Sequence, residues 1–301
     1  MKRFGLIGAA GYIAPRHMQA IKDTGNSLVA ALDNFDSVGI IDNYFPKADF
    51  FTEFERFDRH VDKLRRTNNA LDYLSICSPN YLHDAHIRFG LRNHLDVICE
   101  KPLVLNPWNL DALQEIEIET GNKVYSILQL RLHPSIIALR NKIKAGPSDK
   151  MYHVDLSYIT SRGNWYQRSW KGDIEKSGGI ATNIGVHFFD MLTWIFGDVV
   201  ENHVTEHGQQ KASGHLVLKQ ASVNWFLSID EADIPATERA AGKRTYRCLT
   251  IDGKHTEFSD GFTNLHTASY TSILKGGGFG LADIKTAIQI VHDIRNAKLS
   301  H

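Results

Sequence analysis

Cysteine and proline are both scarce in this sequence of 301 residues, which has 3 cysteines and 8 prolines. The odd, scattered set Cys77, Cys99 and Cys248 does not fit the even-numbered disulfide framework of a small secreted domain. Cys77 and Cys99 lie inside apolar runs that are typical of strands. We therefore expect buried free thiols and a cytoplasmic protein, because the cytoplasm keeps thiols reduced.

An excess of charge is also lacking, since 34 Lys and Arg balance 34 Asp and Glu. A general nucleic-acid binder would carry a basic surplus, so that class is excluded. No apolar run approaches the roughly 18 residues that a membrane-spanning helix needs. The run Phe4–Ile7 after Lys2-Arg3 is too short for the core of a signal peptide. The composition predicts a protein with no nucleic-acid or membrane partner.

Histidine is plentiful, with 15 residues. The pairs His83/His86 and His203/His207 have spacings that a metal ion could use. No carboxylate or cysteine cluster accompanies them in the sequence, so we expect no metal. The alternative is that these imidazoles are solvated or hydrogen-bonded within the core.

The first 122 residues alternate strand and helix patterns, which predicts βαβ units on a parallel sheet and a first domain over residues 1–122. The expected strands are Lys2–Ile7, Ser27–Leu32, Ala48–Phe54, Ala70–Cys77 and Asp96–Cys99, and a sixth strand, Lys123–Leu128, follows directly after residue 122. The expected helices are Pro15–Thr24, a helix that follows a staple and cap at Phe57-Asp58, Tyr81–Arg92 and Pro107–Glu119.

The pattern changes after roughly residue 150, where strands joined by hairpins predict a large, mostly antiparallel sheet with helices on one face. The second domain is predicted over residues 123–301. The expected strands are Tyr152–Thr160, Val199–Glu206, His215–Lys219, Ala221–Ile229, Arg244–Ile251 and His255–Phe258. An apolar helix follows Gly178-Gly179 and runs through Trp194, and a last amphipathic helix covers Leu281–Ala297. The fold class is therefore α/β with two domains.

A glycine turn, Gly8-x-x-Gly11-x-x-Ala14, joins the first expected strand to the first helix. Such a turn lets the backbone approach a pyrophosphate, and the helix N-terminus favours its negative charge. The middle position is Ala10 and the last is Ala14, which departs from the strict G-x-G-x-x-G pattern. Asp33 ends the second strand, where a carboxylate accepts from adenosine ribose hydroxyls and repels a 2′-phosphate. The pattern predicts NAD rather than NADP. The alternatives are a turn glycine needed only for packing and an ordinary turn aspartate.

Polar residues also follow the fourth and fifth strands, as Ser78-Pro79-Asn80 and Glu100-Lys101-Pro102. Ligands of open α/β sheets bind outside the carboxyl ends of the strands. Lys101 therefore suits a donor to a reacting hydroxyl and a developing alkoxide. The alternative is an ordinary surface lysine.

Asn183 and His187 are four residues apart on the apolar helix, so they share a face with Asp190 nearby. An imidazole on the polar stripe of such a helix suits a general base near neutral pH. The alternative is a core histidine hydrogen-bonded by Asn183 or Asp190.

Taken together and in this order, the glycine turn, Ser78-Pro79-Asn80-x-x-His83, Glu100-Lys101-Pro102 and Gly178-Gly179-x-x-x-Asn183-x-Gly-x-His187 resemble the Gfo/Idh/MocA family of NAD(P)-dependent oxidoreductases. The resemblance implies a Rossmann domain, an α/β domain whose open sheet forms dimers or tetramers, and a last helix (281–297) that packs back on the first domain. It implies that Lys101 and His187 are catalytic. Asn183 stands where an Asp is often found, so its implied role is orientation. The implied NAD-binding residues are Gly8, Ala10, Gly11, Tyr12, Ile13, Asp33, Ser78, Pro79, Asn80, His83, Glu100 and Lys101.

A closer resemblance covers 161–172, 177–190, Trp225–Asp230 and 261–267. These segments are similar to a branch of the family that oxidises the 3-hydroxyl of UDP-N-acetylglucosaminuronate to a ketone in lipopolysaccharide and O-antigen synthesis. Arg162 offers a bidentate donor to a carboxylate or phosphate. Trp165 and Tyr166 suit stacking on sugar or nicotinamide, or ordinary packing at a sheet edge. The implied substrate-binding residues are Arg131, Arg162, Asn164, Trp165, Tyr166, Lys171, Thr182, Asn183 and His187.

Two other functions stay open from the sequence. One is an NAD(P)-dependent dehydrogenase of a free sugar or inositol. The other is an NAD-binding sensor without turnover, although such proteins tend to lose the catalytic Lys or His. The sequence also leaves open whether Lys101 or His187 takes the proton, and whether NADH leaves or is reoxidised in place by a second substrate.

Overall fold

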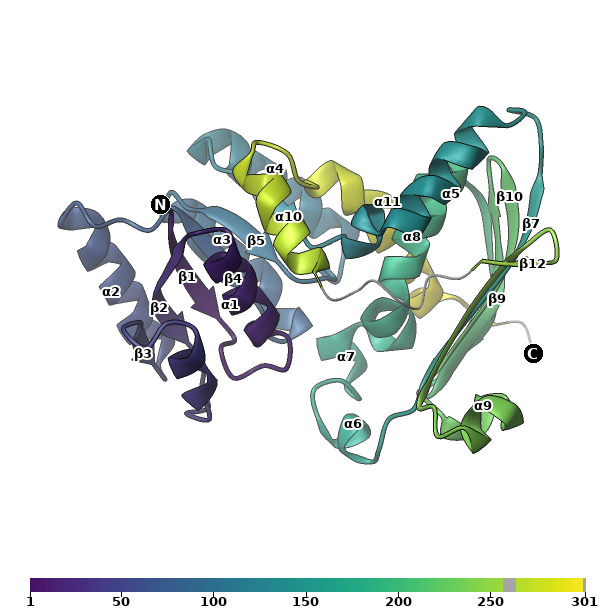
Figure 1. Ribbon diagram of the computed structural model, residues 1–301, viewed down its shortest axis with the longest axis horizontal. Coiled ribbons are helices and arrows are strands. Elements are labelled where there is room, and N and C mark those ends of the chain that lie inside the picture. The colour runs from purple at the N-terminus through teal and green to yellow at the C-terminus, as the bar shows by residue number, and fades with distance from the viewer. Residues whose placement is uncertain (257–263, 300–301) are drawn as a thin grey trace. The chain divides into compact units, whose positions relative to one another are not determined.

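The computed structural model describes residues 1–256 and 264–299, which form two compact units (Figure 1). The first unit is Met1–Ile127 with Thr263–Ile284, and the second is Leu128–Phe262 with Lys285–His301. The expected division at 122/123 lies before the last strand of the first sheet, whereas the contacts divide the chain after it. A late segment of the chain does return to the first unit, and it includes residues 264–284. That helix 281–297 packs on the first domain stays a prediction.

The first unit contains a six-stranded sheet in the order β3-β2-β1-β4-β5-β6, and every pairing is parallel. The order reverses between β1 and β4, which is where doubly wound sheets bind ligands. The central strands are apolar and buried, as expected for strands covered on both faces. The strands are β1 (Arg3–Ile7), β2 (Ser27–Leu32), β3 (Asp49–Phe51), β4 (Tyr73–Ile76), β5 (Asp96–Cys99) and β6 (Val124–Ser126).

Among the described residues, five α-helices lie wholly in the first unit, and α10 lies beside α1 although the two are far apart in sequence (Figure 1). The expected start of the second helix at Phe57-Asp58 is wrong. That helix begins at Phe54, and the fully buried Phe57 packs in its first turn instead of forming a staple before it. The helices are α1 (Ala14–Asp23), α2 (Phe54–Arg66), α3 (His83–Arg92), α4 (Pro107–Thr120) and α10 (Leu265–Leu274), with short turns η1 (Gly39–Asn43) and η2 (Asn80–Leu82).

The second unit contains a six-stranded sheet in the order β12-β11-β7-β10-β9-β8. Among the described strands of this sheet, only the pair β7–β10 is parallel, so the expectation of a mostly antiparallel sheet is confirmed. The last expected strand, His255–Phe258, ends at residues 257–258, which lie outside the described residues. Residues 261–263, part of the segment 261–267 that carries the closer resemblance, also lie outside them. The strands are β7 (Tyr152–Thr160), β8 (Val199–His207), β9 (Lys211–Leu218), β10 (Ala221–Ser228), β11 (Thr245–Ile251) and β12 (Lys254–His255).

Helices α5 and α8 lie together against one face of this second sheet (Figure 1). The expected helix after Gly178-Gly179 has two parts, because it opens with the π-helical turn η4 before it becomes α8. The helices of this unit are α5 (Pro134–Ala145), α6 (Trp165–Arg168), α7 (Ile174–Ser177), α8 (Val186–Phe196) and α9 (Ala236–Ala240), with short turns η3 (Gln129–Leu132), η4 (Ala181–Gly185) and η5 (Glu231–Asp233). Helix α11 (Leu281–Asn296) begins in the first unit and continues in the second from Lys285. Among the described residues, no helix combines the length and the apolar character needed to cross a bilayer.

Candidate active site

The glycine turn between β1 and α1 brings the backbone of three segments close together. Gly8 has a φ of +87°, and a Cβ there would lie 2.5 Å from the carbonyl carbon of Cys77. Its N–H donates to Leu32 O at 2.8 Å, and the N–H of Gly11 donates to Gly8 O at 3.0 Å. Only glycine fits at Gly8, because a side chain would be strained and would strike the backbone after β4. Helix α1 then begins with no side-chain cap from Ile13, and Tyr12 next to it is exposed.

Asp33 holds this turn as well as marking the end of β2. Its Oδ2 accepts from the N–H of Ala10 at 2.9 Å, and its Oδ1 accepts from the N–H of Phe35 at 3.0 Å. Each carboxylate oxygen has more than one lone pair, so accepting a ribose hydroxyl remains compatible with these bonds. The sequence predicted a role for Asp33 from its distance to the glycines, and the structure adds its direct hydrogen bond to Ala10 within the turn.

The ends of β4 and β5 lie side by side, since Ile76 pairs with Cys99 in the parallel register. His83, at the start of α3, joins the segments that follow them. Its Nε2 lies 2.8 Å from Ser78 O and its Nδ1 lies 2.7 Å from Pro102 O. Burial lowers the pKa of His83, which favours a neutral ring that donates to one carbonyl at a time. His83 was predicted to bind the cofactor, and in this structure its ring braces the chain on either side of that predicted site.

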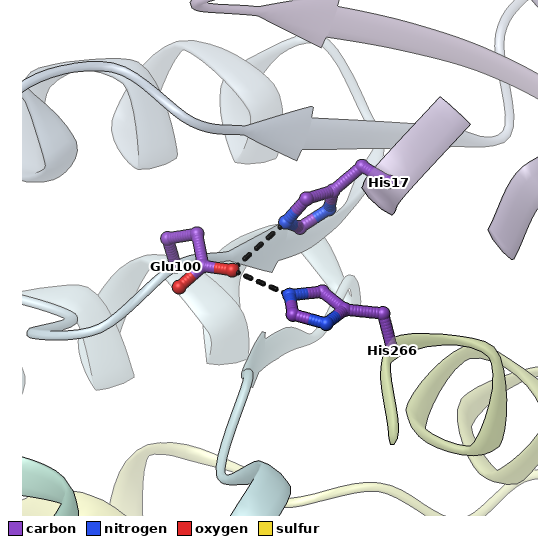
Figure 2. Close-up of side chains that lie close together, drawn as sticks. All are labelled: His17, Glu100 and His266. Carbon is purple, nitrogen blue, oxygen red and sulfur yellow. Dashed lines mark hydrogen bonds and ion pairs between the residues drawn. The ribbon is translucent and has the colours of Figure 1, made fainter. Parts of the chain in front are cut away.

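Glu100 turns its carboxylate into the first unit, where two histidines donate to the same oxygen (Figure 2). His17 comes from α1 and His266 from α10, and all three side chains are buried. Sequence analysis missed both histidines, because nothing in their spacing relates residues 17, 100 and 266.

These three residues are also a set of potential metal ligands. However, Glu100 Oε1 lies at the point on which the two Nε2 atoms converge, 3.0 Å from His17 and 2.8 Å from His266. In a metal centre the ion would take that point and the oxygen would be one of its ligands. The arrangement is that of a hydrogen-bonded carboxylate.

In the second unit, Asn183 lies in the π-turn η4 and His187 in the first turn of α8. Single π-turns inside helices are frequent at functional sites. Asn183 Nδ2 donates to the hydroxyl of Tyr166, whose ring is buried at 2% exposure. Tyr166 was predicted to stack on sugar or nicotinamide, whereas here it holds Asn183. Thr182, also predicted to bind substrate, is fully buried and donates to Gly178 O at 2.7 Å.

The other residues predicted to bind the substrate differ in how far they are buried. Arg131 is buried and forms a bidentate ion pair with Asp190 of α8, with contacts of 3.1 and 2.7 Å. It therefore anchors the helix that carries His187. Arg162 and Asn164 are exposed, and Trp165 is 54% exposed.

A cavity of about 290 Å³ opens in the second unit beside the start of η4. Lys171 and Arg295 line it, together with the glycine pair Gly178-Gly179 and the turn between β8 and β9. Apolar side chains, including Ile174 and Ile294, form much of its wall. The cavity therefore combines two cations with an apolar surface, a combination that suits an amphipathic anion.

Comparison with known proteins agrees with this arrangement. Residues 2–127 match the model of the oxidoreductase family with an NAD-binding Rossmann fold, and residues 149–227 match that family's C-terminal alpha/beta domain. The chain belongs to the Gfo/Idh/MocA oxidoreductase family. The first unit is its NAD-binding Rossmann domain, so the predicted family, fold class and cofactor are confirmed.

Two solved structures of the WlbA (WbpB) dehydrogenase from Thermus thermophilus are 48% identical to this chain, covering 100% of it and 97% of theirs. Their TM-scores are 0.97 and 0.96; one holds NAD and alpha-ketoglutarate, and the other holds NAD and UDP-GlcNAcA. The WlbA dehydrogenase from Bordetella pertussis shares the fold, with 18% identity, a TM-score of 0.80 and coverage of 98% of this chain and 94% of its own.

Among curated proteins, glucose-6-phosphate 3-dehydrogenase from Bacillus subtilis is 24% identical over 73% of this chain. That match spans 60% of the Bacillus protein, so the chain aligns with less than two thirds of this relative's length.

Proposed function

We propose that this protein oxidises the 3-hydroxyl of a UDP-N-acetylglucosaminuronate-type nucleotide sugar to the 3-keto sugar, with NAD as the oxidant, in surface polysaccharide synthesis. The observation that carries the proposal is the end-to-end likeness, at 48% identity, to a dehydrogenase crystallised with NAD and UDP-GlcNAcA. Glucose-6-phosphate 3-dehydrogenase, a more distant relative, also takes its name from oxidation at a sugar 3-position.

The first unit offers the residues for NAD. Gly8 and Gly11 form the tight turn at the start of α1, where a helix N-terminus suits a pyrophosphate. Asp33 suits the adenosine ribose of NAD better than the phosphate of NADP. When bound, NAD accepts the hydride from C3. Ser78, Pro79 and Asn80 are the proposed contacts for its nicotinamide end.

The residues of this chain then handle the proton. His187 accepts the proton of the 3-hydroxyl, while Lys101 donates a hydrogen bond to the oxygen as negative charge develops on it. Asn183, held by Tyr166, keeps the hydroxyl and the imidazole in line. The C–H bond breaks with its electron pair leaving as hydride, the O–H bond loses its proton to His187, and the ketone remains.

The second unit offers groups for the substrate's anionic parts. Arg162 is exposed and presents a planar fork that matches the uronate carboxylate. The cavity lined by Lys171 and Arg295 suits the diphosphate, with Trp165 as a stacking surface. Lys171 and Arg295 can bind the diphosphate even if each already has a partner, because a polyanionic ligand competes well for a partly exposed guanidinium or ammonium group.

The proposal is tested by incubating the protein with NAD and a panel of UDP-sugars, free sugars and inositol, and detecting keto products by mass spectrometry. A keto product from UDP-N-acetylglucosaminuronate is expected. Oxidation of free sugars or inositol alone would favour the alternative of a free-sugar dehydrogenase. One arm includes alpha-ketoglutarate, because absorbance alone would miss NADH that is reoxidised in place.

The assembly and location are also proposed. We infer a cytoplasmic homo-oligomer, a dimer or tetramer built through the sheet of the second unit. Light scattering coupled to size-exclusion chromatography would measure the mass, and a monomer at micromolar concentration would contradict the proposed oligomer.

A further inference from the structure

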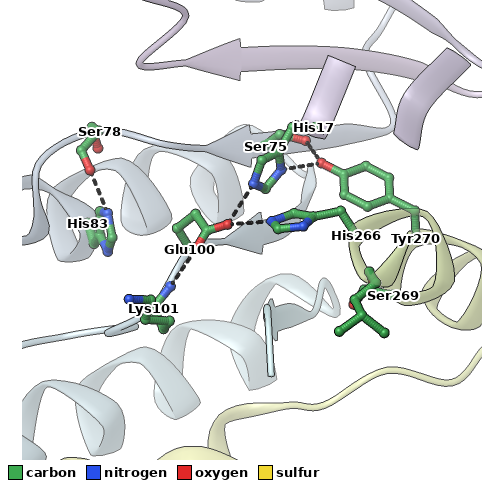
Figure 3. A network of polar contacts seen from close by, with 10 residues as sticks. His17, Ser75, Ser78, His83, Glu100, Lys101, His266, Ser269 and Tyr270 are labelled. Carbon is green, nitrogen blue, oxygen red and sulfur yellow. Dashed lines mark hydrogen bonds and ion pairs between the residues drawn. The ribbon is translucent and has the colours of Figure 1, made fainter. Parts of the chain in front are cut away.

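A buried polar network in the first unit includes Glu100, the residue before Lys101 (Figure 3). Glu100 Oε1 accepts from His17 Nε2 at 3.0 Å and from His266 Nε2 at 2.8 Å. The exposed fractions are 8% for Glu100, 0% for His17 and 4% for His266. Burying a carboxylate this deeply is costly unless it is hydrogen-bonded, so these two donors are needed for Glu100 to stay where it is.

The network continues to β4 through α10. The hydroxyl oxygen of Tyr270 lies 2.7 Å from His17 Nδ1 and 2.6 Å from Ser75 Oγ. Both Nε2 atoms face a carboxylate oxygen and must carry the hydrogen. A neutral His17 then accepts at Nδ1 from Tyr270, which in turn accepts from Ser75. One continuous chain of donors therefore runs from β4 to the carboxylate.

The charge in this network is negative. Burial alone would raise the pKa of Glu100, but the hydrogen bonds from His17 and His266 outweigh it and hold the pKa well below its usual range. Burial lowers the pKa of His17, so its ring is neutral at pH 7. Glu100 is thus an anion held by two imidazole N–H groups.

Lys101 is the next residue, and the chain is held on both sides of it. The N–H of Lys101 lies 3.3 Å from Glu100 Oε2, and the carbonyl of Pro102 lies 2.7 Å from His83 Nδ1. His17 stands one turn into the helix that begins at the glycine turn. The network thus connects the helix of the cofactor turn, the returning helix α10 and the residue that precedes the lysine.

We propose that His17 and His266 are positioning residues, which fix Glu100 and through it set the place of Lys101 beside the cofactor. This inference rests on the proposed dehydrogenase function. A displacement of about 1 Å of a catalytic group costs on the order of 100-fold in rate, so a device that locks the backbone at Lys101 acts directly on kcat.

The test compares three variants of His266 and its helix. His266→Leu removes the donor, whereas His266→Gln retains an N–H at the corresponding position. Ser269→Ala is the matched control, because its buried hydroxyl donates within α10 to Leu265 O, and Figure 3 marks no hydrogen bond from it to His266 or Tyr270. We expect His266→Leu to lower kcat by about 10- to 100-fold, when kcat is expressed per mole of protein that binds NADH. KM and NADH affinity should stay within about twofold, and the pH profile of kcat should shift.

His266→Gln should recover most of kcat, and Ser269→Ala should match the wild type. Tyr270→Phe, which keeps the ring and removes only the hydroxyl, serves if His266→Leu does not fold, and it should lower kcat by a few fold. The proposal is overturned if the folded variants keep the wild-type kcat and pH profile, or if Gln is no better than Leu.

A second readout separates this inference from the proposed function. If the wild type converts no sugar, the proposed function fails, but the backbone amide resonance of Lys101 still reports its position. That resonance should move in His266→Leu and return in His266→Gln. An unmoved resonance would overturn the positioning role without reference to any activity.

Discussion

The two units build their functional groups in opposite ways. In the first, Glu100 is buried and its carboxylate is bound by side chains from residues 17 and 266, far away in the sequence. In the second, Arg162 and Trp165 are exposed on one short segment next to the buried Tyr166. The residues around Glu100 thus depend on long-range burial, whereas Arg162 and Trp165, two of the proposed substrate contacts, lie on a local surface. Substitutions in the first unit should therefore change kcat, stability or NADH affinity, whereas those in the second should change the KM for the sugar, except at His187.

The largest expected effect is that of His187→Ala. Loss of a general base lowers kcat by about 10²–10⁴-fold, while NADH binding, which depends on the first unit, stays unchanged. Steady-state kinetics and fluorescence titration with NADH measure the two quantities. Equal losses of kcat and NADH affinity would contradict the proposed role.

The next effect is on stability and depends on pH. Burial lowers the pKa of His86 from 6.5 to about 4. Between those values the unfolded chain binds a proton that the folded chain does not, so the free energy of unfolding falls as the pH is lowered. This site alone accounts for on the order of 3 kcal/mol, all of it present above pH 6.5 and lost by about pH 4.

The matched comparison uses His86→Asn, whose carbonyl still accepts from Ser78 Oγ as His86 Nδ1 does at 2.9 Å. Urea unfolding at several pH values should show that this variant loses less stability in acid than the wild type. The same change at the exposed His94, His94→Asn, should leave the acid dependence as it is. If both variants follow the wild-type curve, burial of His86 is not the cause.

A smaller effect is expected at the glycine turn. Gly8→Ala puts a Cβ 2.5 Å from the Cys77 carbonyl carbon at a positive φ, so the turn must shift. NADH affinity should fall by about 10- to 100-fold, since strain of this kind costs roughly 1–3 kcal/mol. Gly25→Ala is the control, because its φ is also positive, at +73°, but nothing lies within 4 Å of its Cβ. Equal NADH affinity in the two variants would mean that the turn does not approach the cofactor.

The smallest expected effect belongs to the second unit. Arg162→Ala should raise KM for a UDP-uronate by about 10-fold and leave KM for the corresponding neutral UDP-sugar nearly unchanged, because only the uronate offers a carboxylate. The ratio of the two KM values is the measurement. A parallel rise in both would assign Arg162 to the shared part of the substrate.

Much of the fold followed from local pattern. The strands Ser27–Leu32 and Tyr152–Thr160 have the predicted bounds, because buried and half-buried strands show their burial directly in the sequence. Helices α5 and α10 were not predicted. In α5 only Ile136 and Ile143 are buried, so the apolar stripe is sparse. Segment 265–274 is rich in Ser and Thr, which have modest helix propensity, and its buried side chains include His266 and Tyr270. Tertiary contacts therefore stabilise α10.

The candidate site likewise contains residues that local sequence patterns predict and residues that only the fold brings together. Gly8, Asp33, Lys101 and His187 could be proposed because motif spacing along the chain marks them. His17 and His266 could not, because only the folded sheet and the return of the chain bring them to Glu100. Tyr166 shows a third case, in which the residue was found but its contact was not, since burial of its ring depends on the fold of the whole second unit.

The central claim is a hydride transfer from C3 of a UDP-uronate sugar that needs both Lys101 and His187. Its most direct test uses substrate deuterated at C3, followed by mass spectrometry of the sugar and the cofactor in a single turnover. The account predicts a 3-keto sugar without the deuterium and reduced cofactor that carries it, with both products strongly reduced in His187→Ala and in Lys101→Met. Unchanged sugar with the wild-type protein, or deuterium retained in the oxidised product, would contradict it.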